Sequence, residues 1–555
     1  MMTLLSKRLL AVGLALCALI LTSALQAEET ATVSDESAPA GFESIVLKLT
    51  TKSYREKQGI IAELTALDDE RVRPVLKEML EGRLHYTKDK SHIVFIKDVE
   101  DGYEITDVVN AASLGVVGTR DVKKVKVNNT LRGILRGEIA KLSLKSKDDD
   151  IRRMAVIELL QDPDEQTVGL LRAMLPAESN KDIIELIGVA LAVDDISKED
   201  KALRLSAIEV LEDSLYPEAR QALLPLVARN EDGSYRESDS DIRKAAAGAL
   251  STIDSRREIN AFAETVFFGL SLGSVLLLTA IGLAITFGVM GVINMAHGEM
   301  MMLGAYTTYI IQSLMPNYID YSLFISIPAA FVVAGLFGVA IERGVIRFLY
   351  GRPLETLLAT FGVSLILQQL VRTTISAQNV TVSTPSWMSG SLQINPVLSI
   401  TYNRLYIIIF SLIVFFALLY VLKKTILGLQ VRAVSQNRAM ARAMGVRSDW
   451  VDALTFGLGS GIAGIAGVAL SQLTNVGPNL GQSYIIDSFM VVVFGGVGNL
   501  WGTLVGALSL GVVNKFLEPW SGAVLAKIFV LVFIILFIQK KPRGLFPQKG
   551  RAAEN

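Results

Sequence analysis

A series of long apolar runs in the second half of the chain constrains the fold more than any other feature of the sequence. A helix needs about 20 residues to cross a hydrocarbon bilayer core, and within residues 265–341 the only Asp, Glu, Lys or Arg side chains are Glu299 and Asp320. The runs predict an all-α membrane fold, a polytopic bundle of about 8–9 transmembrane helices. The expected spans are residues 264–290, 297–315, 322–341, 355–373, 404–422, 451–473, 484–498, 500–517 and 522–539.

The first 27 residues have the layout of a secretory signal. Lys7 and Arg8 precede an apolar run over residues 9–21, and small residues follow it. This three-part pattern predicts a signal peptide at residues 1–27. An uncleaved anchor helix is the alternative, and with either reading the segment that follows is exported.

Residues 28–260 are charged throughout, so we expect them to form a separate domain that ends where the membrane domain, residues 261–555, begins. Three helical motifs recur in this extension: "IRRMAVIELL" at 151, "LRLSAIEVL" at 203 and "IRKAAAGAL" at 242. Helix pairs that recur about every 40–50 residues predict a mostly α-helical, HEAT-like solenoid. Within it, "HIVFIKDVEDGYEI" alternates in the manner of a small β-hairpin.

The distribution of basic residues between the spans predicts the orientation in the membrane. The segments "ERGVIRFLYGRPLE", "KKTILGLQVRAVSQNRAMARAMGVR" and "KKPRGLFPQKGR" are rich in Lys and Arg, whereas "TISAQNVTVSTPSWMSGSLQINPVLSITYN" has neither. Basic loops of membrane proteins face the cytoplasm. The extension is therefore expected to be periplasmic and the C-terminus cytoplasmic, which agrees with the signal peptide.

Glycines at a spacing of four residues predict close helix packing. Such a spacing leaves one helix face bare, so that another helix can approach it. The expected packing residues are Gly457 and Gly461 in one helix, and Gly498, Gly502 and Gly506 in another.

The basic loop at residues 427–446, "LGLQVRAVSQNRAMARAMGV", is amphipathic rather than apolar. One reading makes it a topology signal that lies along the lipid headgroups. The other makes it a short helix that projects into the cytoplasm and docks on a soluble motor subunit. Composition does not separate the two.

Several classes of function lack the motifs that they need. The segment "GGVGNLWG" at 495 is no phosphate-binding loop, because no Gly-Lys-Ser/Thr follows it, and the chain has no other nucleotide-binding motif. The spans contain no cysteine and no H-E-x-x-H or G-x-S-x-G motif, which disfavours an intramembrane enzyme. We expect a transport component without a cofactor or a nucleic-acid partner, and ATP hydrolysis, if it drives transport, in a separate subunit.

His297 and Glu299 stand out because ionisable groups inside a bilayer are costly. One reading makes Asn294, His297 and Glu299 a gate or cavity lining; the other makes them a polar helix start near the cytoplasmic surface, capped by Asn294. A metal site is disfavoured, because residues two apart on a helix do not point at one ion. The full set of candidate pathway residues is Asn294, His297, Glu299, Gln368, Gln369, Asn475, Tyr484 and Asp487.

The membrane half resembles the branched-chain amino acid permease family of ABC importers. The segments "GVINMAHGEMMMLGAY", "LLATFGVSLILQQ", "GGVGNLWGTLVGAL" and "KPRGLFPQKGR" match that family in order. The basic loop resembles the coupling loop of ABC importer permeases. The resemblance implies that the residues coupling to the ATPase are Arg432, Ala433, Asn437, Arg438, Ala441 and Gly445.

Within that family, the exported extension together with "STPSWMSG" and "QVRAVSQNRAMARAMG" is similar to permeases of urea ABC transporters. The resemblance implies a urea permease that works by alternating access and is coupled to ATPase subunits through residues 428–446. Branched-chain amino acids and short-chain amides remain alternative cargoes, and a passive solute channel is the alternative of another class.

The same resemblance implies a location and a set of partners. The chain is expected in the bacterial inner membrane as a multi-pass protein, in contact with the lipid bilayer. The implied partners are a second homologous permease, two cytoplasmic ATPase subunits and a periplasmic solute-binding protein.

Overall fold

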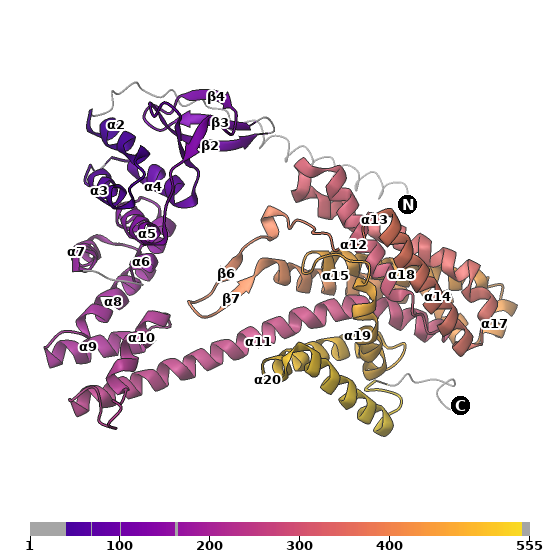
Figure 1. Ribbon diagram of the computed structural model, residues 1–555. Coiled ribbons are helices and arrows are strands. Elements are labelled where there is room, and N and C mark those ends of the chain that lie inside the picture. Colours follow the sequence, from indigo (N-terminus) through magenta and orange to yellow (C-terminus); the bar gives the residue numbers. More distant parts are fainter. Residues whose placement is uncertain (1–39, 68, 100–101, 161–164, 547–555) are drawn as a thin grey trace, which may run out of the picture. The chain divides into compact units, whose positions relative to one another are not determined.

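The computed structural model describes residues 40–546, except 68, 100–101 and 161–164 (Figure 1). The predicted signal peptide lies outside the described residues. The chain divides into two compact units, one reaching to Leu211, here the N-unit, and one starting at Glu212, here the membrane unit. The boundary predicted near residue 260 falls inside α11 (Ser240–Met290). Composition changes from charged to apolar within this helix, while its backbone continues.

The N-unit is mostly helical, and its first helices enclose a core around Phe42, Leu64 and Leu76. Its helices are α2 (Ala40–Leu47), α3 (Tyr54–Thr65), α4 (Val72–Glu81), α5 (Asn129–Ser143), α6 (Asp149–Leu160), α7 (Glu165–Met174), α8 (Lys181–Asp195) and α9 (Lys201–Glu212). The motifs at 151 and 203 form α6 and α9, and the motif at 242 forms the start of α11. The HEAT-like character of these repeats stays a prediction.

The predicted β-hairpin is part of a larger antiparallel sheet. The strands are β1 (Leu84–Thr87), β2 (Ile93–Val99), β3 (Gly102–Asp107), β4 (Ser113–Val117) and β5 (Val122–Lys124), in the order β4-β3-β2-β1-β5. Strands β2 and β3 form the expected pair, with Val99 opposite Gly102. The sequence pattern missed the other three strands because each is only three to five residues long.

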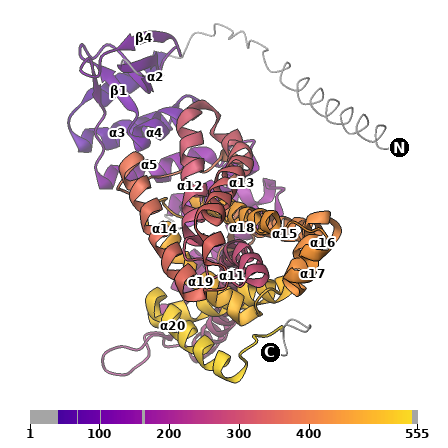
Figure 2. The same cartoon turned by 90° about the vertical axis from the view of Figure 1, so that its right-hand side faces the viewer.

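The membrane unit begins with α10 (Pro217–Val227) and continues with α11, whose second half enters the bundle. The following helices are α12 (His297–Leu314), α13 (Ile319–Gly344), α14 (Pro353–Thr374), α15 (Tyr402–Lys424), α16 (Ile426–Gln436), α17 (Arg438–Ala443), α18 (Ser448–Ser471), α19 (Leu480–Gly495) and α20 (Leu500–Lys540). A two-stranded sheet, β6 (Ser391–Gln393) and β7 (Ser399–Thr401), precedes α15. In Figure 2, α14 lies on one side of α18, and α15 to α17 lie on the other.

Among the described residues, six helical runs are long and apolar enough to cross a membrane. They are Ser240–Met290, Pro316–Gly344, Pro353–Thr374, Tyr402–Lys424, Ser448–Ser471 and Leu500–Lys540. Each of the nine predicted runs lies in a helix or extends past its end by at most three residues. The runs at 500–517 and 522–539 lie in α20, which a kink at Gly522 divides into two helices. One prediction needs correction. Helix α19, expected at 484–498, starts earlier and is shorter than a span.

Glycines let the central helices approach each other to backbone contact. A Cβ atom on Gly467 of α18 would lie 1.9 Å from the carbonyl oxygen of Met301 in α12, and one on Gly304 would lie 2.0 Å from that of Gly464. Such distances are far below van der Waals contact, so α12 and α18 cross at a point where only glycine fits.

The predicted glycine sets contact neighbouring helices, with one correction. Cβ atoms on Gly457 and Gly461 would meet Val339 and Phe331 of α13, and one on Gly502 would meet Gly495 of α19. Gly498 does not belong to a helical stripe, because it lies before the start of α20, in a turn with φ +76°. A left-handed φ favours glycine, and Gly498 still packs closely against α11, because a Cβ atom on Gly288 would lie 2.5 Å from its Cα.

Candidate functional site

Helix α12 begins inside the bundle rather than at its surface. Nε2–H of His297, its first residue, donates a 3.0 Å hydrogen bond to the carbonyl oxygen of Thr279. Thr279 lies about three turns, or about 16 Å, before the end of α11. Residues 291–296 therefore turn back into the bundle, and the expected position near the membrane surface is wrong. The sequence reading assumed that a break between two helices marks the edge of the membrane.

One face of α14 carries a buried polar stripe beside the returning segment. We call Thr356, Thr360, Ser364 and Gln368 the α14 stripe; they recur every four residues, lie on one helix face and are all buried. Thr360 Oγ1 accepts a 3.1 Å hydrogen bond from the backbone N–H of Met295. The stripe therefore offers hydroxyl and amide groups to the interior of the bundle.

Glu299, in the first turn of α12, faces this stripe. Its Oε1 accepts hydrogen bonds from Ser364 Oγ at 2.8 Å and from Gln368 Nε2 at 2.7 Å. The side chain is only 1% exposed. Its partners belong to another helix and not to the backbone of α12, so the carboxylate does more than stabilise the start of its own helix.

Asn294 does not cap α12. The residue that precedes the helix is Ala296, which makes no side-chain capping bond, and Asn294 Oδ1 accepts a 3.0 Å hydrogen bond from the Ala296 N–H. Asn294 thus closes a turn within the returning segment. His297 contacts α11 while Glu299 contacts α14, so the two side chains do not converge on one point.

Four buried polar atoms along this segment have no hydrogen-bond partner among the residues that the structure describes. They are Asn294 Nδ2, His297 Nδ1, Glu299 Oε2 and Tyr306 Oη. Native proteins pair roughly nine in ten of their buried polar groups. All four exceptions lie within residues 294–306, which makes this segment the candidate site for a polar ligand.

A second polar cluster joins α19 to α20. Asp487 Oδ2 accepts a 2.9 Å hydrogen bond from Lys527 Nζ, which lies 6.0 Å from the centre of the Tyr484 ring. Helix α19 also approaches α12, because a Cβ atom on Gly298 would lie 2.5 Å from the carbonyl oxygen of Gly481. Tyr484 and Asp487 therefore lie on a helix that packs against the start of α12, with partners of their own.

Two predicted pathway residues do not join either cluster. Gln369 and Asn475 are exposed. Gln369 follows Gln368 directly, and one residue along a helix turns a side chain by about 100°, away from the α14 stripe. Of the predicted set, the structure thus pairs Glu299 with Gln368. Asn294 and His297 are buried in the same segment as Glu299, but their hydrogen bonds go to Ala296 and Thr279.

The basic loop forms two helices instead of the single expected one. Asn437 separates α16 from α17 with an extended backbone, and its side chain caps α17 by accepting a 2.9 Å hydrogen bond from the Met440 N–H. Gly445 ends the element with φ +86°. We call residues 426–445 the elbow. Asparagine is a favourable N-cap, which explains the break at this position.

Ion pairs fix the elbow to the start of α18. Arg438 donates to both carboxylate oxygens of Asp452, at 2.7 and 2.8 Å, and lies 4.0 Å above the Tyr350 ring. Arg442 binds Ser448 Oγ at 2.6 Å and Asp449 at 3.1 Å. The arginines of α17 therefore hold the elbow in place and are not free for a partner.

Methionines form the exposed apolar surface of α17. Met440 and Met444 are 62% and 79% exposed, whereas Ala441 is buried against Val431 and Val434. Of the residues predicted to couple to an ATPase, Ala433 and Ala441 lie against the core and Arg432 and Asn437 are exposed. The elbow is thus a fixed projection with an apolar tip.

Comparison with known proteins identifies the membrane unit. Residues 265–538 match the family described as "Branched-chain amino acid transport system / permease component". The chain is 31% identical over 293 residues to the permease LivH of Salmonella typhimurium, an alignment that covers 51% of this chain and 95% of that protein. It is 29% identical over 297 residues to the permease BraD of Pseudomonas aeruginosa, covering 52% and 96%. The chain belongs to this permease family.

A further likeness reaches beyond branched-chain amino acid permeases. The ribose import permease RbsC of Escherichia coli is 31% identical over 140 residues, covering 23% of this chain and 44% of that protein. No solved structure matches the chain significantly. The family match starts at residue 265, so the family says nothing about the N-unit of this permease.

Sequence reasoning missed several residues of the permease that the structure brings into these sites. The α14 stripe had a signal, a polar residue at every fourth position of an apolar segment, of which only Gln368 was singled out. Thr279 and Lys527 gave no such signal, because their roles depend on which helices meet. Met440 and Met444 lie in a loop whose basic residues drew attention first.

Proposed function

We propose that this permease is the transmembrane subunit of an ATP-driven importer and that its cargo is a branched-chain amino acid, carried by alternating access. The observation that carries the proposal is the placement of Glu299 against the α14 stripe, in the first turn of a helix that begins inside the bundle. Transporters place cargo sites where helices are interrupted near the middle of the membrane. The names of LivH and BraD support the choice of cargo.

The proposed route of energy into the permease is the elbow. Its exposed Met440 and Met444 suit the groove of a soluble ATPase subunit, because methionines adapt to an apolar partner surface. The ion pair between Arg438 and Asp452 would pass a movement of the elbow to α18. The proposed assembly contains two ATPase subunits, a second homologous permease and a solute-binding protein.

The proposed orientation follows the basic loops. The elbow and the C-terminus face the cytoplasm, and the N-unit faces the periplasm. The passive channel, kept as an alternative above, has no use for an elbow of this kind. Loss of uptake on inhibition of ATP hydrolysis would distinguish the importer from the channel.

Glu299 is proposed to accept hydrogen bonds from the nitrogen of the cargo. Its Oε2 has no partner among the described residues, and Oε1 is held by Ser364 and Gln368. A charged hydrogen bond contributes about 1.5–3 kcal/mol and a neutral one about 0.5–1.5. Glu299→Gln is expected to raise the half-saturation concentration for a zwitterionic amino acid about tenfold. Glu355→Gln, at an exposed carboxylate at the start of α14, is the control that makes the same change outside the site.

Urea is the second candidate cargo. It is favoured by the motif similarity described above, in which "STPSWMSG" and the elbow sequence resemble those of urea permeases. Urea is neutral, and its N–H groups also suit carboxylate, hydroxyl and amide acceptors. The two cargoes differ in the response to Glu299→Gln, because an amino acid loses an ion pair between its ammonium group and the carboxylate. Urea loses only the stronger hydrogen-bond acceptor, so its half-saturation concentration should rise less.

Uptake of radiolabelled leucine and urea tests the cargo. Cells with and without the gene are compared, each label with the other compound as competitor. Loss of leucine uptake that urea does not compete for supports the proposal. Loss of urea uptake with leucine uptake intact overturns the amino acid cargo and leaves the urea importer.

Substitution of the apolar tip tests the elbow. Met440→Glu together with Met444→Glu is expected to abolish uptake while the permease stays in the membrane, because the ATPase no longer docks. Met154→Glu, at a methionine of α6 that is 64% exposed, is the matched control and should leave uptake unchanged. Uptake at the wild-type rate by the double variant would refute the docking role.

A further inference from the structure

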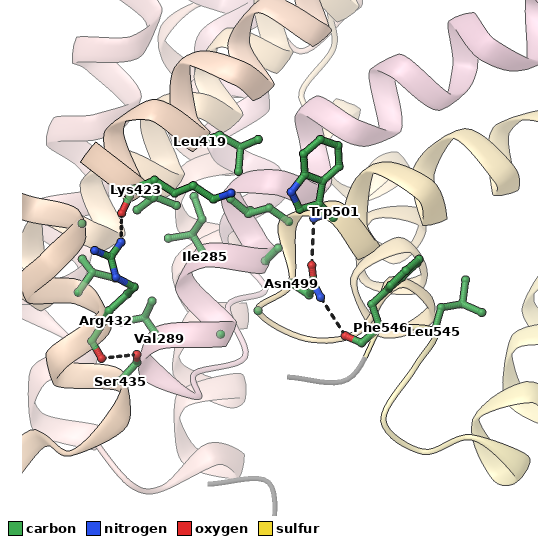
Figure 3. Close-up of a pocket in the computed structure, with 17 residues that line it drawn as sticks. Ile285, Val289, Leu419, Lys423, Arg432, Ser435, Asn499, Trp501, Leu545 and Phe546 are labelled. Atoms are coloured by element: carbon green, nitrogen blue, oxygen red, sulfur yellow. Dashed lines mark hydrogen bonds between the residues drawn. The ribbon is translucent and has the colours of Figure 1, made fainter. Parts of the chain in front are cut away.

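A cavity of about 690 Å³ opens beside the elbow, at the end of α15. Parts of α11, α15 and α16 line it, together with the segment that leads into α20 and the C-terminal Leu545 and Phe546 (Figure 3). Its volume is in the range of small-molecule sites, about 300–1,000 Å³. The cavity is separate from Glu299 and the α14 stripe, none of which lines it.

The lining of this cavity combines apolar walls with two cations. Ile285, Leu419 and Trp501 are among its apolar residues, and Lys423 and Arg432 are the charged ones. Figure 3 shows Lys423 extending from the end of α15 toward Trp501, with Arg432 of α16 beside the end of α15. No acidic residue is among the described residues that line it.

Both cations lack an anionic partner. Arg432 donates to the carbonyl oxygen of Leu422, and within the part of the chain that the structure describes neither Arg432 nor Lys423 forms an ion pair. The other two arginines of the elbow, Arg438 and Arg442, each have a carboxylate. No carboxylate among the described residues therefore neutralises the positive charges of Lys423 and Arg432.

The cavity lies at the depth of the lipid headgroups. Lys423 is next to the last residue of α15, a 23-residue apolar span, so it lies where that span leaves the hydrocarbon core. Trp501 is 46% exposed, lies at the start of α20, and its ring contacts Phe415 of α15, so it forms the apolar wall below Lys423. This depth follows from the spans and does not depend on which side of the membrane is cytoplasmic.

We propose that this cavity binds an anionic phospholipid, with the phosphate between Lys423 and Arg432 and an acyl chain along the apolar wall. Basic pockets between transmembrane helices bind anionic headgroups in this way. A free phosphate would use the two cations but not the wall of Ile285, Leu419 and Trp501. The bound lipid joins α15 to α16, and so the membrane span to the elbow.

Lipid binding to the purified full-length chain tests the proposal, with native mass spectrometry as the readout. Phosphatidylglycerol is compared with phosphatidylcholine, which carries no net charge. Each cation near an anionic headgroup is expected to contribute about fivefold in affinity, so Lys423→Gln with Arg432→Gln should weaken phosphatidylglycerol binding about 25-fold. Phosphatidylcholine, whose choline cation offsets the charge of its phosphate, should bind the wild type more weakly and lose less affinity in this variant.

A matched control separates the site from general charge. Lys424→Gln with Arg447→Gln removes the same charge from exposed positions, at the end of α15 and just before α18, that do not line the cavity. It should leave phosphatidylglycerol binding as in the wild type. Equal weakening by both double variants would overturn the proposal in favour of a diffuse surface charge. Equal affinity of the wild type for the two lipids would also overturn it.

Two further arms distinguish other sources of negative charge. Inorganic phosphate and glycerophosphoglycerol, the headgroup without acyl chains, should compete only weakly. Competition as strong as that of the intact lipid would mean that the cavity binds only the headgroup, and it would contradict the proposal that an acyl chain lies along the apolar wall. If the Lys423 and Arg432 variant binds lipid normally but no longer binds the ATPase, the two cations serve an acidic partner surface and the proposal fails.

Discussion

Gly467 gives a direct test of the crossing that positions Glu299. A Cβ atom at Gly467→Ala would lie 1.9 Å from the carbonyl oxygen of Met301, 2.8 Å from the Ala305 nitrogen and 2.9 Å from the Met301 carbonyl carbon. All three are backbone atoms, so no side-chain rotation relieves the overlap. Helices α12 and α18 must separate by more than about 1 Å, since carbon and oxygen pack at about 3.5 Å.

The cost of this separation is estimated from overpacked cores. An added methyl group that forces backbone shifts costs about 1–3 kcal/mol, and sometimes more. Alanine is a better helix former than glycine by up to about 1 kcal/mol, which offsets part of that cost. We therefore expect a net destabilisation of about 1–2 kcal/mol. Movement of α12 also shifts Glu299, two residues before Met301, away from the α14 stripe.

Thermal unfolding of the full-length chain in detergent measures the first effect, and leucine uptake measures the second. Gly467→Ala should unfold at a lower temperature than the wild type, and its half-saturation concentration for leucine uptake should be higher. Gly362→Ala in α14 is the matched control, because a Cβ atom there has no neighbour within 4 Å. It should unfold at or slightly above the wild-type temperature. Wild-type unfolding and uptake by Gly467→Ala would refute the backbone contact.

Two further predictions concern ion pairs. Arg438→Ala leaves Asp452, whose side chain is 6% exposed, without its partner. Loss of one member of a buried pair costs about 3–5 kcal/mol, so the unfolding temperature should fall strongly and should recover in the neutral pair Arg438→Gln/Asp452→Asn. Arg442→Ala, at an exposed pair, should cost under about 1 kcal/mol. In the N-unit, two hydrogen bonds from Arg152 lower the pKa of Glu178 to about 2. Because this pKa is depressed, the pair stabilises the N-unit above pH 4.5, the ordinary pKa of Glu, and the effect is lost as the pH falls toward 2. Circular dichroism melts of the full-length chain should show Glu178→Gln less stable than the wild type at pH 5 and the two converging near pH 2; parallel curves would contradict the pair.

The helices of the membrane unit could be located from the sequence because apolar length is a local property. Every predicted run lies in a helix except for a few residues at its ends, and the family resemblance agrees with the comparisons. Depth could not be predicted in the same way. A break in apolar periodicity between α11 and α12 looks the same whether the chain turns at the surface or returns into the bundle. Only the contact of His297 with Thr279 decides between them.

The sequence of the elbow contains a helix-capping residue, Asn437, that the prediction of a single helix overlooked. The side chain of Asn437 accepts a hydrogen bond from the N–H of Met440, three residues later, which is the usual pattern of an N-cap. Alanines and arginines on both sides favour helix, and this hid the break. The pair of Arg438 and Asp452 had no local signal, because it joins residues on either side of a turn. Local capping is thus readable from sequence, whereas the partner of a charged side chain is not.

The unpaired atoms around Glu299 argue against a purely structural role for this segment. A structural polar cluster is stabilising only when its members satisfy one another, and each buried polar group left without a partner costs about 1–3 kcal/mol. Here Glu299 Oε1 has two donors from α14, while Glu299 Oε2, His297 Nδ1 and Asn294 Nδ2 have none among the described residues. Leucine or alanine at these positions would avoid that cost and pack well. The polar groups, the helix that begins inside the bundle and the α14 stripe together support the proposal that a polar cargo supplies the missing hydrogen bonds as it passes.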